Sequence, residues 1–383
     1  MRNRTWPALL LGCALASAAA IGMSDADVLP ALKALAPRGL LIGVALSQAQ
    51  SDGKDAVALP IVTRHFNSIT AENILKWENV HPETDRFVFE PADRFVDFGG
   101  KHDMFIVGHT LLWHQQTPAS VFTGPDGSPI GREALLARLR THIQTVVGRY
   151  RGRVHGWDVV NEALEEDGTL RNSKWRQILG EDYIAKAFEF AHQADPDAEL
   201  YYNDFNLTKA AKRAGALRIV RQLKARGLRV DGVGDQGHWL LAWPAPEDID
   251  SMLAEIGAAG VKAHITELDV DVLPRDERMY GADLDARKAF RAETNLYPDA
   301  LPAGKHQELA ARYADIFKVF VAHSRSVARV TFWGVTDRTS WLNNFPIPGR
   351  VNYPLLWDRA GQPKPAFHAV ARVLEESRRD TAE

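Results

Sequence analysis

The amino-acid sequence predicts an α/β protein built as a single (β/α)8 barrel. Short apolar runs alternate along the chain with amphipathic stretches at helical spacing, and each apolar run ends in polar or glycine residues. No internal repeat and no proline- or serine-rich linker interrupts this alternation. Eight strand–helix units in one unbroken chain of 383 residues favour a closed parallel barrel over an open sheet.

The predicted strands have apolar interiors, because the strands of such a barrel are buried on both faces. They are residues 40–46, 67–70, 104–108, 154–160, 199–202, 230–233, 262–266 and 329–333. Two of the intervening helices are clear from their pattern. One carries an apolar stripe from Leu135 to Val147, and the other runs from about Lys209 to Arg226 and stops at Gly227, a residue suited to a left-handed helix end.

The composition is that of a soluble globular enzyme, with 45% hydrophobic residues, 25% charged residues and a formal charge of −3. No basic run points to nucleic acid as a partner, and we expect a monomer. The N-terminal segment has the layout of a secretory signal, with Arg2 and Arg4, an apolar stretch too short to span a membrane, and small residues up to Ala20. A lipoprotein signal at Cys13 is an alternative.

These features predict a signal peptide over residues 1–20 and a catalytic barrel domain over residues 24–378. The protein is then expected outside the cytoplasm, secreted or in the periplasm of a bacterium.

Polar residues stand where the predicted strands end. They form the segments TAEN (70–73), GHTLLWH (108–114), NE (161–162), NDFN (203–206), GDQGH (234–238), TELD (266–269) and WGVTD (333–337). One such residue is often only a turn former or a helix cap. Together they converge on the rim where barrel active sites lie, so they predict an active site.

The sequence contains no complete motif for dinucleotide binding, for a zinc-binding histidine pair or for a serine nucleophile. The Gly232-x-Gly234-x-x-Gly237 match to a dinucleotide fingerprint lacks the helix that should follow it. His109 and His114 do not have the spacing of a zinc-binding pair, and no G-x-S-x-G sequence is present.

Two glutamates remain as candidate catalytic groups. Glu162 ends the fourth predicted strand and Glu267 the seventh, so barrel closure brings them to facing sides of one cavity. Two carboxyl groups across a cavity are what the cleavage of a glycosidic bond requires. Asp269 and His238 are placed to keep Glu267 ionised, whereas Glu162 beside Asn161 has the surroundings of a proton donor.

Tryptophans gather near the predicted rim, where flat indoles beside polar groups suit sugar rings. They are Trp77, Trp113, Trp175, Trp239, Trp243, Trp333 and Trp341.

The segments GHTLLWHQQTP, WDVVNEALEEDG, YYNDFN, HITELDV and TFWGVTDRTSWL resemble the ordered motifs of the family 10 glycoside hydrolases, the endo-β-1,4-xylanases. The resemblance covers roughly residues 29–374. It implies Glu162 as acid/base, Glu267 as nucleophile, His238 and Asp269 as groups that orient Glu267, and Asn161 as a ligand of the sugar 2-hydroxyl. It further implies a substrate-binding set of Glu72, Asn73, Lys76, His109, Trp113, Gln236, Trp333 and Trp341.

The resemblance implies a retaining endo-xylanase that acts on xylan or xylo-oligosaccharides, without a metal or cofactor. Phe205 stands where the family often has tyrosine, so we expect it on the leaving-group side without a hydroxyl. Ala263 is smaller than the residue usual in that strand. Two alternatives stay open: a related β-1,4-glycanase or transglycosylase, and a catalytically silent carbohydrate-binding barrel.

Overall fold

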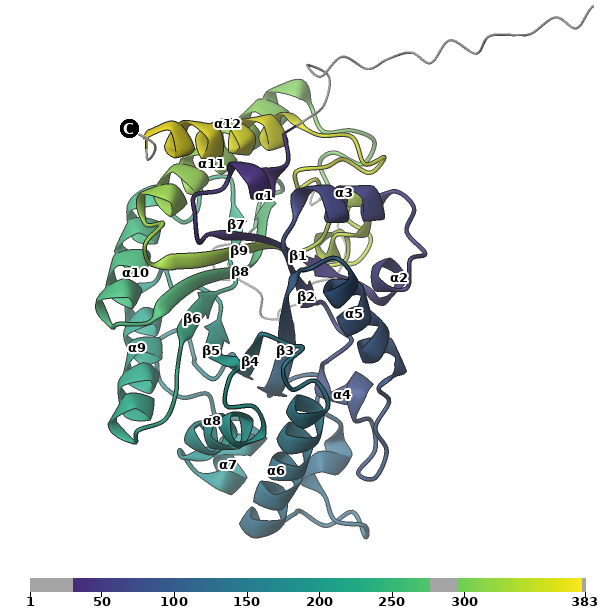
Figure 1. The fold of residues 1–383 in the computed structure, drawn as a ribbon, viewed down its shortest axis with the longest axis vertical. Coiled ribbons are helices and arrows are strands. Elements are labelled where there is room, and N and C mark those ends of the chain that lie inside the picture. Colours follow the sequence, from purple (N-terminus) through teal and green to yellow (C-terminus); the bar gives the residue numbers. More distant parts are fainter. Residues whose placement is uncertain (1–29, 276–294, 381–383) are drawn as a thin grey trace, which may run out of the picture. The chain divides into compact units, whose positions relative to one another are not determined.

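The computed structural model describes residues 30–275 and 295–380. The predicted signal peptide lies outside these residues and stays a prediction. The residues from Ala31 onward form one compact unit, and Figure 1 shows its ring of strands with helices on the outside. The predicted (β/α)8 barrel is confirmed.

The barrel strands are all parallel, and each one overlaps a strand predicted from the sequence. They are β1 (Leu41–Leu46), β2 (Ser68–Ala71), β3 (Phe105–Trp113), β4 (Gly156–Asn161), β5 (Glu199–Asp204), β6 (Gly232–Asp235), β8 (Lys262–Asp271) and β9 (Val327–Phe332). The pairing of β6 with β8 and of β1 with β9 closes the sheet into a ring.

One long helix follows each barrel strand and covers the outside of the ring (Figure 1). These helices are α3 (Ala58–His65), α5 (Glu90–Lys101), α6 (Arg132–Arg149), α8 (Tyr183–Ala194), α9 (Ala210–Ala225), α10 (Pro246–Ala258), α11 (Ala303–Ala322) and α12 (Pro365–Asp380). Shorter helical turns are α1 (Leu32–Leu35), α2 (Gln48–Ser51), α4 (Trp77–Val80), α7 (Lys174–Leu179), η2 (Ala119–Phe122), η5 (Asp337–Thr339) and η6 (Trp341–Asn343).

Both helices singled out in the sequence form as predicted. The stripe of α6 is completely buried, from Leu135 to Val147. Helix α9 ends at Ala225, and Gly227 has a positive φ of 69°, the left-handed conformation for which glycine is suited. Within the described part of the chain, none of the helices has the length and apolarity needed to cross a membrane.

The short strand β7 (His238–Leu240) was not predicted. It pairs only with β8, beyond the ring, in the register His238↔Asp269, Trp239↔Val270 and Leu240↔Asp271. Three residues are too few to show an alternating pattern, so no sequence periodicity marks this strand.

The carboxyl ends of the central strands share one level at the mouth of the barrel. Trp113 of β3 pairs with Asn161 of β4, Asn161 pairs with Asn203 of β5, and Asn203 pairs with Gly234 of β6. Below this level the barrel interior is densely filled. A Cβ atom on Gly108 would lie 2.1 Å from the Trp157 ring, so only glycine lets that indole pack across β3.

Candidate active site

A cavity of about 420 Å³ lies at the mouth of the barrel. It brings together every candidate site residue from the sequence except Asp269 and Phe205. The predicted residues that line it are Glu72, Asn73, Lys76, His109, Trp113, Asn161, Glu162, Gln236, His238, Glu267, Trp333 and Trp341. Most of them lie on or directly after barrel strands, so closure of the sheet brings these together, whereas Lys76 and Trp341 come from segments beyond β2 and β9.

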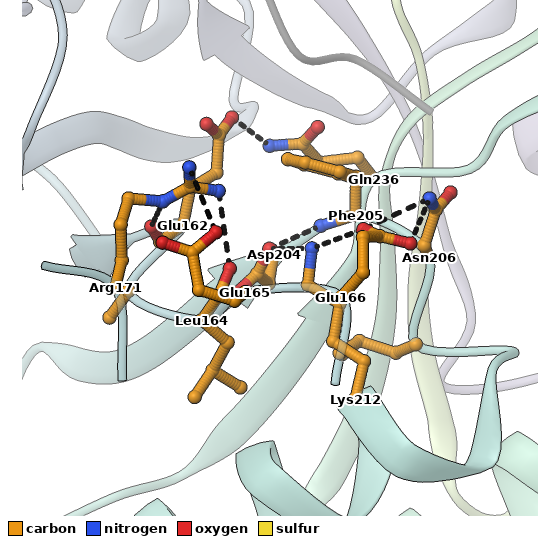
Figure 2. Close-up of polar contacts among 12 residues, drawn as sticks. Glu162, Leu164, Glu165, Glu166, Arg171, Asp204, Phe205, Asn206, Lys212 and Gln236 are labelled. Carbon is orange, nitrogen blue, oxygen red and sulfur yellow. Dashed lines mark hydrogen bonds and ion pairs between the residues drawn. The ribbon is translucent and has the colours of Figure 1, made fainter. Parts of the chain in front are cut away.

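Glu162 follows β4 directly and has a positive φ of 56°, a conformation that residues other than glycine rarely adopt. Its carboxyl group accepts hydrogen bonds from the Trp113 Nε1–H at 2.9 Å and from Gln236 Nε2 at 2.8 Å, and Figure 2 shows the second of these. Asn161 Nδ2 donates a further bond of 3.3 Å to Oε1. The side chain is thus fixed on three sides and faces the cavity.

The Glu162 carboxyl is buried, with only 4% of the residue exposed. Burial raises the pKa of Glu162 to about 7, and the negative charge of Asp204 adds to this rise against the hydrogen bonds from Gln236 and Trp113. A carboxylic acid with a pKa near neutrality keeps its proton in slightly acidic solution. Such a group is suited to donate that proton.

Glu267 has opposite surroundings within the same cavity. Its Oε2 lies 3.1 Å from His238 Nε2, and the other imidazole nitrogen lies 3.0 Å from Asp269 Oδ1. Both nitrogens therefore face carboxylates, as in a doubly protonated imidazolium. Burial would lower the pKa of His238, but the charge and the hydrogen bond of Asp269 raise it to about 9.

The cationic His238 determines the charge state of Glu267. Burial would raise the pKa of Glu267, but the hydrogen bond from His238 and nearby positive charges outweigh this effect and lower its pKa. One cavity therefore holds two glutamates of opposite tendency: Glu162 tends to keep its proton, and Glu267 tends to lose it.

Asn203 connects these two glutamates, and the sequence did not reveal this role. Its Nδ2 lies 2.9 Å from Asn161 Oδ1 and donates a bond of 3.0 Å to Glu267 Oε1. Its Oδ1 accepts a bond of 2.6 Å from the Thr266 hydroxyl. Asn203 stands in the NDFN segment noted above, but only the neighbouring strands show where its amide points.

One wall of the cavity is polar and carries charge. Lys76 Nζ donates a bond of 2.9 Å to Asn73 Oδ1 and lies 5.0 Å from the centroid of the Trp113 ring. Burial lowers the pKa of Lys76 and raises that of Glu72. His109 Nδ1 lies 2.9 Å from Asp158 Oδ2, so the ring is oriented from below.

Two tryptophans form an aromatic wall beside His238. The Trp341 ring lies 4.7 Å from the imidazole, and the Trp333 ring packs edge-on against His109 at 5.5 Å. Phe345 stacks on Trp341 at 4.5 Å. Phe345, Asn344 and Gln116 also line the cavity and were missed. Phe345 and Asn344 lie on the loop beyond β9, whereas Gln116 follows the end of β3 within the quoted GHTLLWHQQTP segment but was not singled out there.

Several of the tryptophans that the sequence placed near the rim belong to the core instead. Trp77, Trp175 and Trp239 are at most 3% exposed and do not line the cavity. Trp77 stacks on His142 at 3.6 Å between α4 and α6. Trp77 and Trp175 lie in the first turns of α4 and α7, whereas Trp239 lies in strand β7.

Phe205 does not line the cavity either. It is 4% exposed, and its ring centroid lies 3.4 Å from Lys212 Nζ. Figure 2 shows Phe205 between Asp204 and Asn206. Among the residues that the structure describes, no group of three or more His, Cys, Asp or Glu is arranged to hold a metal ion.

A (β/α)8 barrel with one protonated and one ionised glutamate across its mouth has the architecture of a glycoside hydrolase. The chain belongs to glycosyl hydrolase family 10, whose family model matches residues 31–373.

Characterised relatives and solved structures agree with this assignment. The chain is 40% identical to endo-1,4-beta-xylanase A of Xylanibacter ruminicola, over 95% of this chain and 98% of the relative. It is also 40% identical to beta-1,4-xylanase of Dictyoglomus thermophilum, over 82% of this chain and 83% of the relative. A GH10 endoxylanase structure from a sugarcane soil metagenome superposes with a TM-score of 0.86 at 44% identity, covering 89% of this chain and 99% of the other.

Proposed function

We propose that this protein is a retaining endo-1,4-β-xylanase that cleaves internal bonds of xylan. The observation that carries the proposal is the pair of glutamates that line one cavity, one bonded to neutral amide and indole donors and the other to His238, with pKa values shifted in opposite directions. Only this combination supplies a proton for the leaving oxygen and an anion for the sugar carbon at the same pH.

In the first step an oxygen of Glu267 attacks the anomeric carbon and forms an ester. The glycosidic carbon–oxygen bond breaks, and the Glu162 proton moves to the departing oxygen. In the second step Glu162, now a carboxylate, takes a proton from water. The water oxygen attacks the same carbon, the ester bond to Glu267 breaks, and Glu162 is protonated again.

The surrounding residues orient the substrate and the nucleophile. Asn161 is assigned to the 2-hydroxyl of the sugar being cleaved, and His238 and Asp269 keep Glu267 ionised. The remaining polar and aromatic groups of the cavity bind the sugars on the non-leaving side. These groups are Glu72, Asn73, Lys76, His109, Trp113, Gln236, Trp333 and Trp341.

Export and assembly are part of the same proposal. Residues 1–20 act as a cleaved signal, the enzyme works outside the cytoplasm, and it is a monomer. N-terminal sequencing of the exported protein and its mass in solution test these two points.

Product analysis on unbranched xylan tests the function. We expect a ladder of short xylo-oligomers early in the reaction, because internal cuts precede the release of small sugars. Cello-oligomers assayed in parallel should react far more slowly, and Glu267→Gln should give no new reducing ends on either substrate. Faster cleavage of cello-oligomers would instead identify a β-1,4-glucanase, and unchanged binding without cleavage would indicate a binding barrel.

A further inference from the structure

A buried ion pair lies behind Glu162, on the side away from the cavity. Asp204 ends β5, and Lys212 lies in the first turn of α9, where its Nζ is 3.0 Å from Asp204 Oδ1. Both side chains are completely inaccessible to solvent. Lys212 also reaches Glu166 Oε1 at 3.1 Å, as Figure 2 shows, so one cation joins the buried carboxylate to a half-exposed one.

Asp204 is connected to the backbone after Glu162 through a tyrosine. The Tyr202 hydroxyl donates to Asp204 Oδ2 at 2.5 Å and accepts the Ala163 backbone N–H at 3.2 Å. Tyr202 is completely buried, so its hydroxyl has no alternative partner in water. The orientation of the peptide bond between Glu162 and Ala163 therefore depends on Asp204.

This peptide bond needs support because Glu162 has a left-handed backbone conformation. The Glu162 N–H, which belongs to the preceding peptide bond, donates to Asn203 O at 2.9 Å. The carbonyl of the Glu162–Ala163 peptide accepts a bond of 3.2 Å from Arg171 Nε. Figure 2 shows the contacts of Arg171 with this segment. Tyr202 supplies the remaining contact by accepting the Ala163 N–H, and its hydroxyl is itself bonded to the buried Asp204.

We propose that Asp204 is a positioning residue for Glu162, which fixes the following peptide through Tyr202, and that the buried Asp204–Lys212 pair contributes to the upper pH limit of the reaction. The proposal rests on the function proposed above, in which Glu162 is the acid/base.

The electrostatics of the cluster agree with this geometry. Burial is the largest cause that raises the pKa of Glu162, and the charge of Asp204 is the next. The charged groups that face Glu162 are Asp204, Glu267, Lys76 and Arg171. The charged or titratable groups that face Asp204 are Lys212, Asp235 and the neutral phenols of Tyr183 and Tyr202, and Glu166 lies on the far side of Lys212.

The substitution Asp204→Asn tests the charge. It keeps the size of the side chain but removes its negative charge. The Lys212 cation is then paired with Glu166 alone and is less neutralised than before. Both changes favour the carboxylate form of Glu162, so the alkaline limb of kcat/KM should move down by about one pH unit. Glu166→Gln is the matched control. It removes a carboxylate from the same lysine at a half-exposed position, where solvent screens the charge, so the limb should stay in place.

The substitution Tyr202→Phe tests the positioning and removes one oxygen only. Hydrolysis of xylan should slow on the order of tenfold, while aryl xylosides whose leaving groups need no proton should be spared. Equal slowing on both substrates would show a merely structural role and overturn the positioning. If Asp204→Asn does not fold, Tyr202→Phe still tests whether this contact positions Glu162.

The outcomes separate the two proposals. An alkaline limb that stays at the wild-type pH in Asp204→Asn overturns the role of the ion pair. If Glu162→Gln slows xylan and activated aryl xylosides equally, the assignment of Glu162 itself fails. In a third outcome, Glu162→Gln slows xylan much more than activated aryl xylosides, but the alkaline limb of Asp204→Asn stays at the wild-type pH. The proposed function then stands, and only the role of the Asp204–Lys212 pair is overturned.

Discussion

The indole of Trp341 is hydrogen-bonded to the carboxylate of Asp269, with 2.6 Å between Nε1 and Oδ2. The other oxygen of Asp269 faces His238, which in turn faces Glu267. The aromatic wall of the cavity and the charge of the nucleophile are thus coupled through one aspartate.

This coupling predicts different effects for two neighbouring tryptophans. Trp341→Phe keeps an aromatic ring but removes the N–H, so kcat should fall, because Asp269 loses a charge-assisted bond of about 1.5–3 kcal/mol. Trp333→Phe, which has no such bond to Asp269, should change mainly KM. Steady-state kinetics and circular dichroism of both variants check this. Indistinguishable kinetics would mean that the hydrogen bond does not influence Glu267.

Glu162→Gln should nearly abolish the cleavage of xylan. The first step on aryl xylosides with good leaving groups should survive, because such groups depart without a proton. Burst kinetics on the activated substrate measure this step directly. A burst as slow as xylan cleavage would argue against Glu162 as the acid.

The activity should decline on the alkaline side with an apparent pKa of about 7. Glu162 must be protonated to act as the acid, its pKa is raised to about 7, and the active fraction therefore decreases as the pH rises through this value. Initial rates at low substrate concentration between pH 4 and pH 10 would show the limb. A limb near pH 9 would point to deprotonation of His238 instead, whose pKa is about 9.

The product should form first as the β-anomer. Direct attack by Glu267 requires the two carboxyl groups to lie about 5–5.5 Å apart, whereas an intervening water needs about 6.5–9.5 Å. Asn203 and His238 hold Glu267 in one orientation, which suits attack better than the holding of a mobile water. Proton NMR of a fresh digest, recorded before mutarotation, distinguishes the anomers. First appearance of the α-anomer would contradict the role of Glu267 as nucleophile.

A buried pair away from the cavity provides a stability prediction. Lys364 Nζ donates to Asp337 Oδ2 at 2.8 Å and to the Tyr353 carbonyl at 2.7 Å, and both charged side chains are at most 3% exposed. Lys364→Met leaves a buried carboxylate without its cation and should lower the free energy of unfolding by about 3–5 kcal/mol.

The matched control for this pair is Arg379→Met, which breaks an exposed pair with Glu375 on α12. Its cost should stay below about 1 kcal/mol. Urea denaturation followed by fluorescence compares the two variants. Similar midpoints for both would show that Asp337 finds another partner or becomes protonated.

The eight barrel strands were predictable because each is buried on both faces and therefore mostly apolar, even where a buried polar residue such as Asp158 interrupts the run. The same logic located the mouth residues, since the polar end of every such strand reaches the same rim. Glu162 and Glu267 could be paired from this reasoning alone.

The remaining features depend on contacts between distant segments. Phe205 follows a strand end like the true cavity residues, yet it packs against Lys212, a partner that no local pattern reveals. Trp175 and Trp239 likewise follow strand ends but fill the core. The role of Asn203 required knowledge of the strands on both sides, and Asn344 comes from a loop beyond the last barrel strand.

Strand β7 makes the environment of the nucleophile sensitive to the number of residues before His238 as well as to the identity of that side chain. His238 meets Asp269 because the two residues are aligned in the hydrogen-bonded ladder between β7 and β8. Side chains along a strand alternate between faces, so one inserted or deleted residue between Gln236 and His238 would turn the imidazole away from Glu267. Loop grafting or indel mutagenesis in this enzyme should therefore leave that segment untouched, even where point substitutions beside it are harmless.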